Sequence, residues 1–146
     1  MTRHELLALR HALEALTIDF WYDVDHHGGL NAAAFYVQDA VFETSIREYR
    51  GRDAVDAFYA RRRQRGARLS LHIVQNFRIE PLSDTQVRCV YVLSVHAADG
   101  EPVLPSRPAI MVAMADELVA RQPDGAWLYQ SRRLKALFRD DTPTTG

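Results

Sequence analysis

Two side chains that exchange protons easily, Asp25 and His72, lie in segments that a fold could bring together. Asp25 ends an apolar helical pattern, Phe20-Trp21-Tyr22-Asp23-Val24-Asp25, and His72 lies inside the strand-like run Leu71-His72-Ile73-Val74. Histidine titrates nearest neutrality, and a nearby carboxylate favours its protonated form. If the two side chains meet in a pocket, they form a general acid–base pair. Tyr22 lies one helical turn before Asp25, so its hydroxyl could reach the same pocket and polarise a substrate oxygen.

The order of the predicted elements would bring these residues together. Apolar residues at helical spacing from Leu6 to Trp21 predict a long first helix, which Gly28-Gly29 ends. A short helix over 32–36, a strand over 40–44 and a helix opening at Asp53 follow, and then strands over about 69–79, 86–97, 108–121 and 126–138. Helices followed by long strands predict an α+β cone, in which a curled mixed or antiparallel sheet carries the N-terminal helices on its concave face and encloses a pocket. The sequence predicts one domain over 1–146, with a disordered polar tail over 139–146.

Composition narrows the class of protein. The chain has 146 residues, of which 47% are hydrophobic and 25% charged, as in a single soluble domain. Its net charge of −1 favours neither nucleic acid nor an anionic membrane. The single cysteine, Cys89, excludes an internal disulfide and fits a reducing compartment. Without a signal-peptide pattern or an apolar run of about 18 residues, we expect a cytoplasmic protein.

The face of the sheet that His72 occupies stays open at this stage. Leu69, Leu71, Ile73, Phe77 and Ile79 share one parity of their strand, and Ser70, His72, Val74, Asn76 and Arg78 share the other. An open antiparallel sheet would turn the second set to solvent. The concave face of a cone, in contrast, lines a pocket that can be polar.

We interpret two further acidic segments as structural. In Asp23-Asp25-His26-His27, adjacent histidines on a helix point about 100° apart and cannot easily share an ion. No second motif completes a ligand set, so we predict no metal site. Asp116 lies in an apolar strand and needs a partner. Arg132 or Arg133 on the last strand could supply a salt bridge, which is favoured over a role in substrate binding.

Four short segments together resemble SnoaL-like domains of the nuclear-transport-factor-2-like superfamily. They are Asp39-Ala40-Val41-Phe42-Glu43, Gly51-Arg52-Asp53-Ala54-Val55, Leu71-His72-Ile73-Val74-Gln75-Asn76 and Asp124-Gly125-Ala126-Trp127, and the resemblance covers about 5–138. Dehydratase and dehydrochlorinase members carry an aspartate and a histidine where Asp25 and His72 stand. The resemblance implies that His72 abstracts a proton from carbon while Asp25 orients it. Thr44 stands where ketosteroid isomerase has its base, which disfavours that reaction. Ala97 stands where scytalone dehydratase has a second histidine.

The resemblance therefore implies a cofactor-independent lyase of dehydratase or cyclase type. Its substrate would be a small, hydrophobic, cyclic or polyketide-like carbonyl compound, and we expect contacts with it from Phe20, Phe42, Thr44, Tyr91 and Asp116. The alternative is a non-catalytic ligand-binding or accessory subunit, because this fold hosts unrelated functions. Apolar residues on both parities of Val90-Tyr91-Val92-Leu93 predict strands buried on both faces. We therefore expect a homodimer formed through the sheet.

Overall fold

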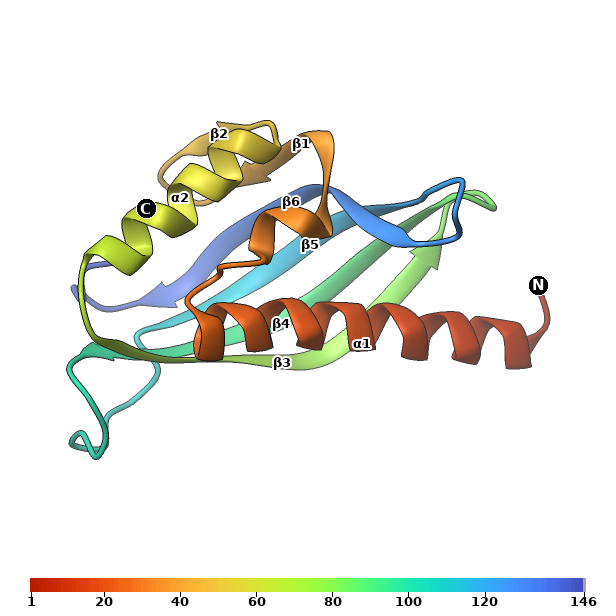
Figure 1. Ribbon diagram of the computed structural model, residues 1–146. Coiled ribbons are helices and arrows are strands. Elements are labelled where there is room, and N and C mark those ends of the chain that lie inside the picture. The colour runs from red at the N-terminus through yellow and green to blue at the C-terminus, as the bar shows by residue number, and fades with distance from the viewer. Residues whose placement is uncertain (146) are drawn as a thin grey trace.

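A computed structural model describes residues 1–145 as a curled six-stranded sheet with helices on its concave face (Figure 1). The elements in chain order are α1 (Arg3–His27), the 3-10 helix η1 (Ala32–Phe35), β1 (Tyr36–Glu43), β2 (Glu48–Arg50), α2 (Arg52–Gln64), β3 (Arg68–Pro81), β4 (Gln86–Asp99), β5 (Met111–Arg121) and β6 (Trp127–Arg139). The strands lie in the order β2-β1-β6-β5-β4-β3. β1 pairs parallel with β6, and every other pairing is antiparallel. The predicted α+β cone is confirmed.

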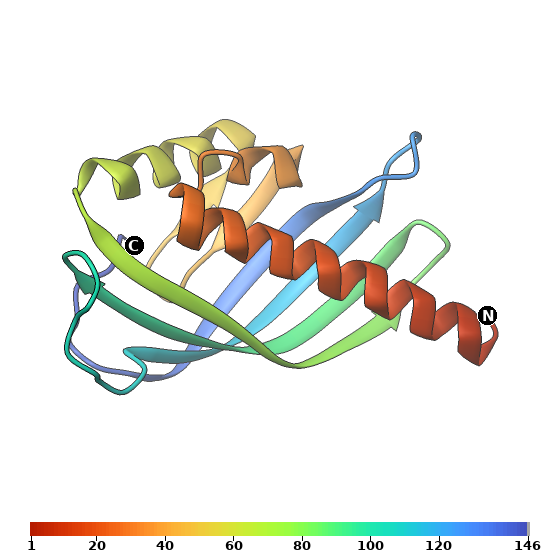
Figure 2. The same ribbon diagram turned by 60° about the horizontal axis from the view of Figure 1, so that its bottom comes forward.

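Helix α1 crosses the open side of the sheet (Figure 2). The Thr2 hydroxyl accepts from the Glu5 amide and the Glu5 carboxylate accepts from the Thr2 amide, a capping box that fixes the start of the helix. Gly28, with φ of 63°, ends it in the left-handed conformation that glycine adopts without strain. The helix buries Leu13, Phe20, Trp21 and Val24 against the sheet. Its last turn therefore lies over the sheet, where Asp25 can reach β3.

A bulge in β3 settles which way His72 points. The pairing of β3 with β4 shifts between Gln75 and Arg78, and Asn76 has φ of 55°. Asparagine tolerates this left-handed conformation better than most residues. The extra residue reverses the alternation, so Leu71 is 46% exposed whereas Phe77, of the same sequence parity, is 2% exposed. His72 thereby shares the concave face with Phe77 and Ser70.

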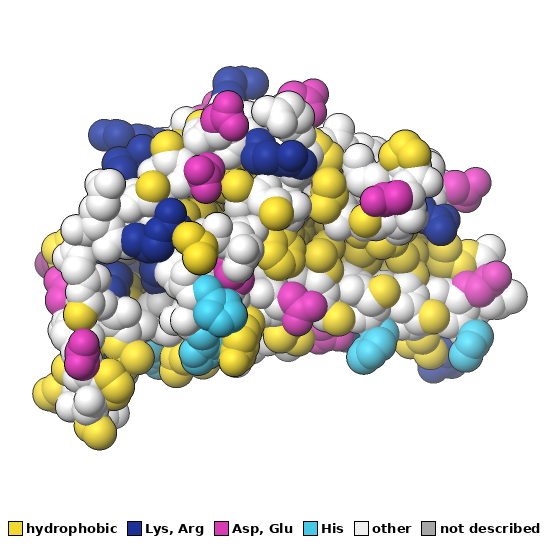
Figure 3. Space-filling model, in the orientation of Figure 1, with side chains coloured by type: hydrophobic (Ala, Val, Ile, Leu, Met, Phe, Trp, Pro, Cys, Tyr) yellow, Lys and Arg dark blue, Asp and Glu magenta, His cyan; other side chains and the backbone are white. Residues whose placement is uncertain are grey.

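The outer surface carries charges of both signs. Figure 3 shows acidic and basic side chains interspersed over one face of the molecule, with apolar side chains gathered in the hollow along α1. Among residues 1–145, the helices are too short or too polar to cross a membrane.

Candidate functional site

The end of α1 and the middle of β3 bring Asp25 and His72 into direct contact. His72 Nδ1 lies 2.6 Å from Asp25 Oδ1, and the His72 backbone amide donates to Asp25 Oδ2 at 2.7 Å. The two side chains are only 12% and 5% exposed. Because an ionised carboxylate only accepts hydrogen bonds, this geometry places the imidazole proton on Nδ1. Nε2, which makes no hydrogen bond to any described residue, is then the basic nitrogen.

Two further residues hold the carboxylate of Asp25. The Ser70 hydroxyl donates to Asp25 Oδ1 at 2.8 Å and accepts from Arg62 Nη2 at 2.6 Å. Arg62 also donates to the Val24 carbonyl oxygen, which ties α2 to the end of α1. Burial raises the pKa of Asp25, but hydrogen bonds from His72 and Ser70 outweigh it and leave that pKa below its ordinary value. Asp25 is therefore ionised at neutral pH.

Burial decides the charge of His72. Desolvation of the ring lowers the pKa of His72 below 6.5 and exceeds the opposing effect of Asp25. The carboxylate thus orients the imidazole without keeping it protonated at neutral pH. A neutral imidazole with a free Nε2 is the state that a general base requires.

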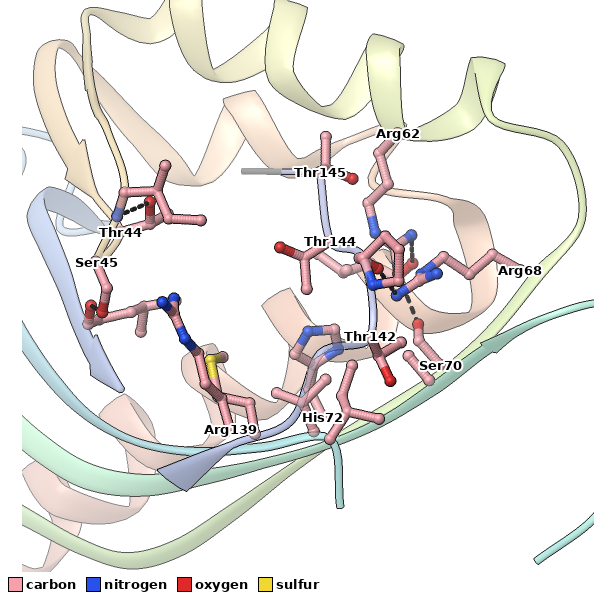
Figure 4. A pocket seen from close by; sticks show the side chains of 18 of the residues that line it. Thr44, Ser45, Arg62, Arg68, Ser70, His72, Arg139, Thr142, Thr144 and Thr145 are labelled. Carbon is pink, nitrogen blue, oxygen red and sulfur yellow. Dashed lines mark hydrogen bonds between the residues drawn. The ribbon is translucent and has the colours of Figure 1, made fainter. Parts of the chain in front are cut away.

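His72 faces a cavity of about 430 Å³ (Figure 4). Apolar side chains line part of it, among them Trp21, Val24, Phe58 and Val95. Polar groups line it as well: Thr44, Ser45, Tyr59, Arg62, Arg68, Ser70 and Arg139. Such a lining, apolar with a few convergent polar groups, is typical of small-molecule sites.

The C-terminal tail lies against this cavity, although the sequence predicted it to be disordered. Residues 140–145 belong to the lining, and Figure 4 shows Thr142, Thr144 and Thr145 beside His72 and Arg62. The Pro143 carbonyl oxygen accepts from Arg68 Nη2 at 3.1 Å, and the Thr142 hydroxyl accepts from Arg107 at 3.2 Å. These two contacts hold the polar segment in place.

Tyr22 does not reach the pocket. The residue is 56% exposed, and its ring packs against His26 with the centroids 4.3 Å apart and the planes tilted by 40°. Tyr22 and Asp25 are three residues apart, so the two side chains differ by about 60° around the helix. That difference turns Tyr22 to solvent while Asp25 points inward.

The five residues expected to contact the substrate lie in different positions relative to the cavity. Phe42 and Thr44 line the cavity, and their contact with a substrate stays a prediction. Phe20 and Tyr91 are fully buried behind the wall, where Phe20 packs edge-on against Trp21 and Tyr91 accepts from the Trp21 indole. They do not line the cavity, so they shape it from behind.

Asp116 points away from the cavity. It lies on the convex face and makes a two-pronged salt bridge with Arg88, at 2.9 and 2.7 Å. A salt bridge is thus confirmed, but its partner is on β4 instead of the predicted Arg132 or Arg133. Arg132 pairs with Glu117 at 2.6 Å, and both side chains are fully buried. Since Glu117 follows Asp116 directly, the alternation of β5 sends the two acids to opposite faces.

Sequence reasoning missed Tyr59, Arg62 and Ser70. Tyr59 lines the cavity, and its hydroxyl makes no hydrogen bond to residues 1–145. Burial raises the pKa of Tyr59 far above its ordinary value, so the hydroxyl keeps its proton. Tyr59 and Arg62 lie three residues apart on α2, which places them one above the other on a helix face. That spacing was the available signal, although Arg62 lies within the basic run Arg61-Arg62-Arg63, which is typical of a solvated helix end.

Over the described part of the chain, His, Cys, Asp and Glu side chains form no group of three suited to hold an ion.

Comparisons with known proteins agree with the fold. A family model described as SnoaL-like domain matches residues 5–133. A search of curated proteins finds no significant match.

Among the solved structures that share this fold are the following three proteins. A putative scytalone dehydratase from Novosphingobium aromaticivorans has a TM-score of 0.82 and 23% identity, over 99% of this chain and 93% of that one. ActVI-ORFA from Streptomyces coelicolor has a TM-score of 0.76 and 15% identity, over 88% and 98%. A hexachlorocyclohexane dehydrochlorinase from Novosphingobium barchaimii has a TM-score of 0.73 and 20% identity, over 94% and 92%. At these identities the likeness establishes the fold.

Proposed function

Because the chain belongs to the SnoaL-like family, we propose that it is a cofactor-independent lyase of dehydratase or cyclase type. One observation carries the proposal: Asp25 Oδ1 lies 2.6 Å from His72 Nδ1 on the wall of a cavity that has both apolar and polar lining residues. The substrate is a small, cyclic or polyketide-like carbonyl compound with a leaving group β to the carbonyl. A cavity of about 430 Å³ is within the range of sites for such molecules.

The reaction begins with the transfer of a proton from the carbon next to the carbonyl to His72 Nε2. The C–H electron pair moves into the carbonyl group and forms an enolate. The enolate then expels the β-hydroxyl group, which takes the proton from the imidazolium and leaves as water. Asp25 keeps the Nδ1 proton in place throughout and stabilises the imidazolium between the two steps.

The enolate oxygen needs a hydrogen-bond donor, and Tyr22 cannot supply it. Tyr59 replaces it in this proposal, because its protonated hydroxyl lines the same cavity without a partner among residues 1–145. Arg62 lines the cavity as well and adds positive charge beside Ser70. Donors that already point at the position of developing charge are often the largest contribution to catalysis.

Loss of water from a β-hydroxytetralone, which yields a naphthol, tests the proposal. We expect the purified protein to form the naphthol, measured by its absorbance, and the His72→Gln variant to lose about 10²–10⁴-fold in rate. Tyr22→Phe is the matched control, since Tyr22 is exposed and should leave the rate unchanged. Equal rates of naphthol formation by His72→Gln and the unaltered protein would contradict the mechanism. Binding of the ketone without turnover across a panel of β-hydroxyketones would favour the ligand-binding alternative.

A further inference from the structure

Trp21 lies flat against the imidazole of His72. The ring centroids are 4.3 Å apart and the planes differ by 11°. Trp21 lies four residues before Asp25, so one turn of α1 supplies both contacts. The carboxylate fixes the edge of the imidazole, but the terminal torsion of histidine is broad and leaves the ring plane free to rotate. The indole face restricts that rotation.

The indole is itself held from behind. Trp21 Nε1 donates to the Tyr91 hydroxyl at 2.9 Å, and that hydroxyl donates to Glu117 Oε1 at 2.6 Å. Arg132 Nε donates to the same Glu117 oxygen at 2.6 Å, and its Nη1 donates to the Tyr36 hydroxyl at 3.0 Å. An indole only donates and a carboxylate only accepts, so the direction of this hydrogen-bonded chain is fixed.

The chain of contacts is costly to bury. Glu117 and Arg132 are fully buried, and Glu117 Oε2 and Arg132 Nη2 lack partners within the described residues. A buried ion pair of this kind is weak evidence for stability, whereas a polar network can specify one arrangement of side chains. The arrangement specified here is the orientation of Trp21.

From these contacts we infer that Trp21 is a positioning residue for the His72 base, and that the Tyr91–Glu117–Arg132 network holds Trp21 in place. The inference rests on the proposed function only in calling His72 a base. Trp21 fixes the plane of the imidazole, so that Nε2 points into the cavity.

The titration of His72 tests the inference without a substrate. The charged groups that face the imidazole are Asp25 from α1, Arg62 from α2 and Arg132 from β6. Trp21 covers the ring, and burial is the main reason why the pKa of His72 is low. Loosening the indole should admit water and move that pKa up towards 6.5.

The experiment is an NMR titration of ¹³C-labelled histidine, with the His72 resonance assigned by its loss in His72→Gln. Trp21→Phe and Tyr91→Phe each break the same indole–phenol hydrogen bond. We expect both to raise the midpoint, and the double variant to raise it no further than one of them. An unchanged midpoint in either folded variant, or additive shifts in the double variant, would overturn the inference.

A second measurement leaves the network intact, in case those variants do not fold. Trp127→Phe leaves Trp21 as the single tryptophan, and protonated imidazoles quench indole fluorescence on contact. The emission should fall as His72 takes its proton, and His72→Gln in the same background should abolish that step. Emission that does not change with the protonation of His72 would contradict the stacking of Trp21 on the imidazole. Absence of lyase activity beside a clear titration effect would count against the proposed function alone.

Discussion

At the scale of single residues, the site works because its two titrating groups hold different charges at neutral pH. Burial lowers the pKa of His72 below 6.5, so the base is neutral above that pH and gains a proton below it. We expect kcat/KM for the β-hydroxytetralone to be level through neutrality and to fall on the acid side with a midpoint below 6.5. An acid limb centred above 6.5 in the pH–rate profile would contradict this account.

Asp25→Asn separates orientation from protonation. The hydrogen bond and charge of Asp25 raise the pKa of His72, so their removal should lower that pKa further. His72 then stays neutral at pH 7, yet an amide can donate to Nδ1 and favour the wrong tautomer. We expect kcat at pH 7 to fall by about 10²–10⁴-fold while the acid limb moves to lower pH. Unchanged turnover, or an acid limb that moves to higher pH, would count against the role of Asp25.

Tyr59→Phe tests the donor to the enolate oxygen. The variant keeps the ring in its place and removes only the hydroxyl. We expect kcat to fall by up to about 10²–10³-fold with little change in KM, because the enolate forms only after binding. Tyr22→Phe, measured beside it, should match the unaltered protein. Equal losses of kcat in the two variants, or no loss of kcat in Tyr59→Phe, would mean that another residue donates to the enolate oxygen.

The sequence was sufficient for the residues whose role follows from position along the chain. It placed Asp25 at the end of a helix and His72 within a strand, and the fold brings them together. It could not place Tyr22, because a helix end leaves open which of two nearby side chains turns inward. The Glu117–Arg132 ion pair could not be predicted either, because it depends on the register of β5 against β6.

At the scale of elements, the bulge at Asn76 decides the site. It explains why parity alone could not orient His72: the alternation of β3 reverses four residues later. Asn76→Val should destabilise the protein by about 1–2 kcal/mol, because a β-branched residue is strained at positive φ. Asn76→Gly is the matched control and should be near neutral or slightly stabilising. Urea denaturation measures both, and equal stabilities of the two variants would contradict the strained conformation at this position.

The C-terminal tail is the second element that the sequence misjudged. Its polar composition predicted disorder, yet Arg68 and Arg107 hold it against the cavity. Removal of residues 140–146 should raise KM for the β-hydroxytetralone severalfold while thermal stability stays near that of the full chain. Because the tail makes few buried apolar contacts, its removal should not change the thermal stability. An unaltered KM after truncation would show that the tail plays no part in binding.

At the scale of the whole molecule, the element order predicted the cone correctly, although the short β2 and the ordered tail were not predicted. The homodimer formed through the sheet stays a prediction. Leu71 and Ile73 are 46% and 41% exposed on the convex face, where a second copy of the chain would cover them. Light scattering should give twice the chain mass, and Ile73→Lys should give the monomer. A monomer at micromolar concentration for the unaltered chain would exclude this interface.

Exchange of the carbon-bound protons of α-tetralone in D₂O is the most direct test of whether His72 abstracts a proton from carbon. This ketone has no β leaving group, so the measurement isolates proton abstraction by His72 from every later step. We expect the protein to speed deuterium uptake next to the carbonyl, measured by NMR, and His72→Gln and Asp25→Asn to abolish the acceleration. Exchange that proceeds equally in the unaltered protein and in His72→Gln would show that His72 is not the base.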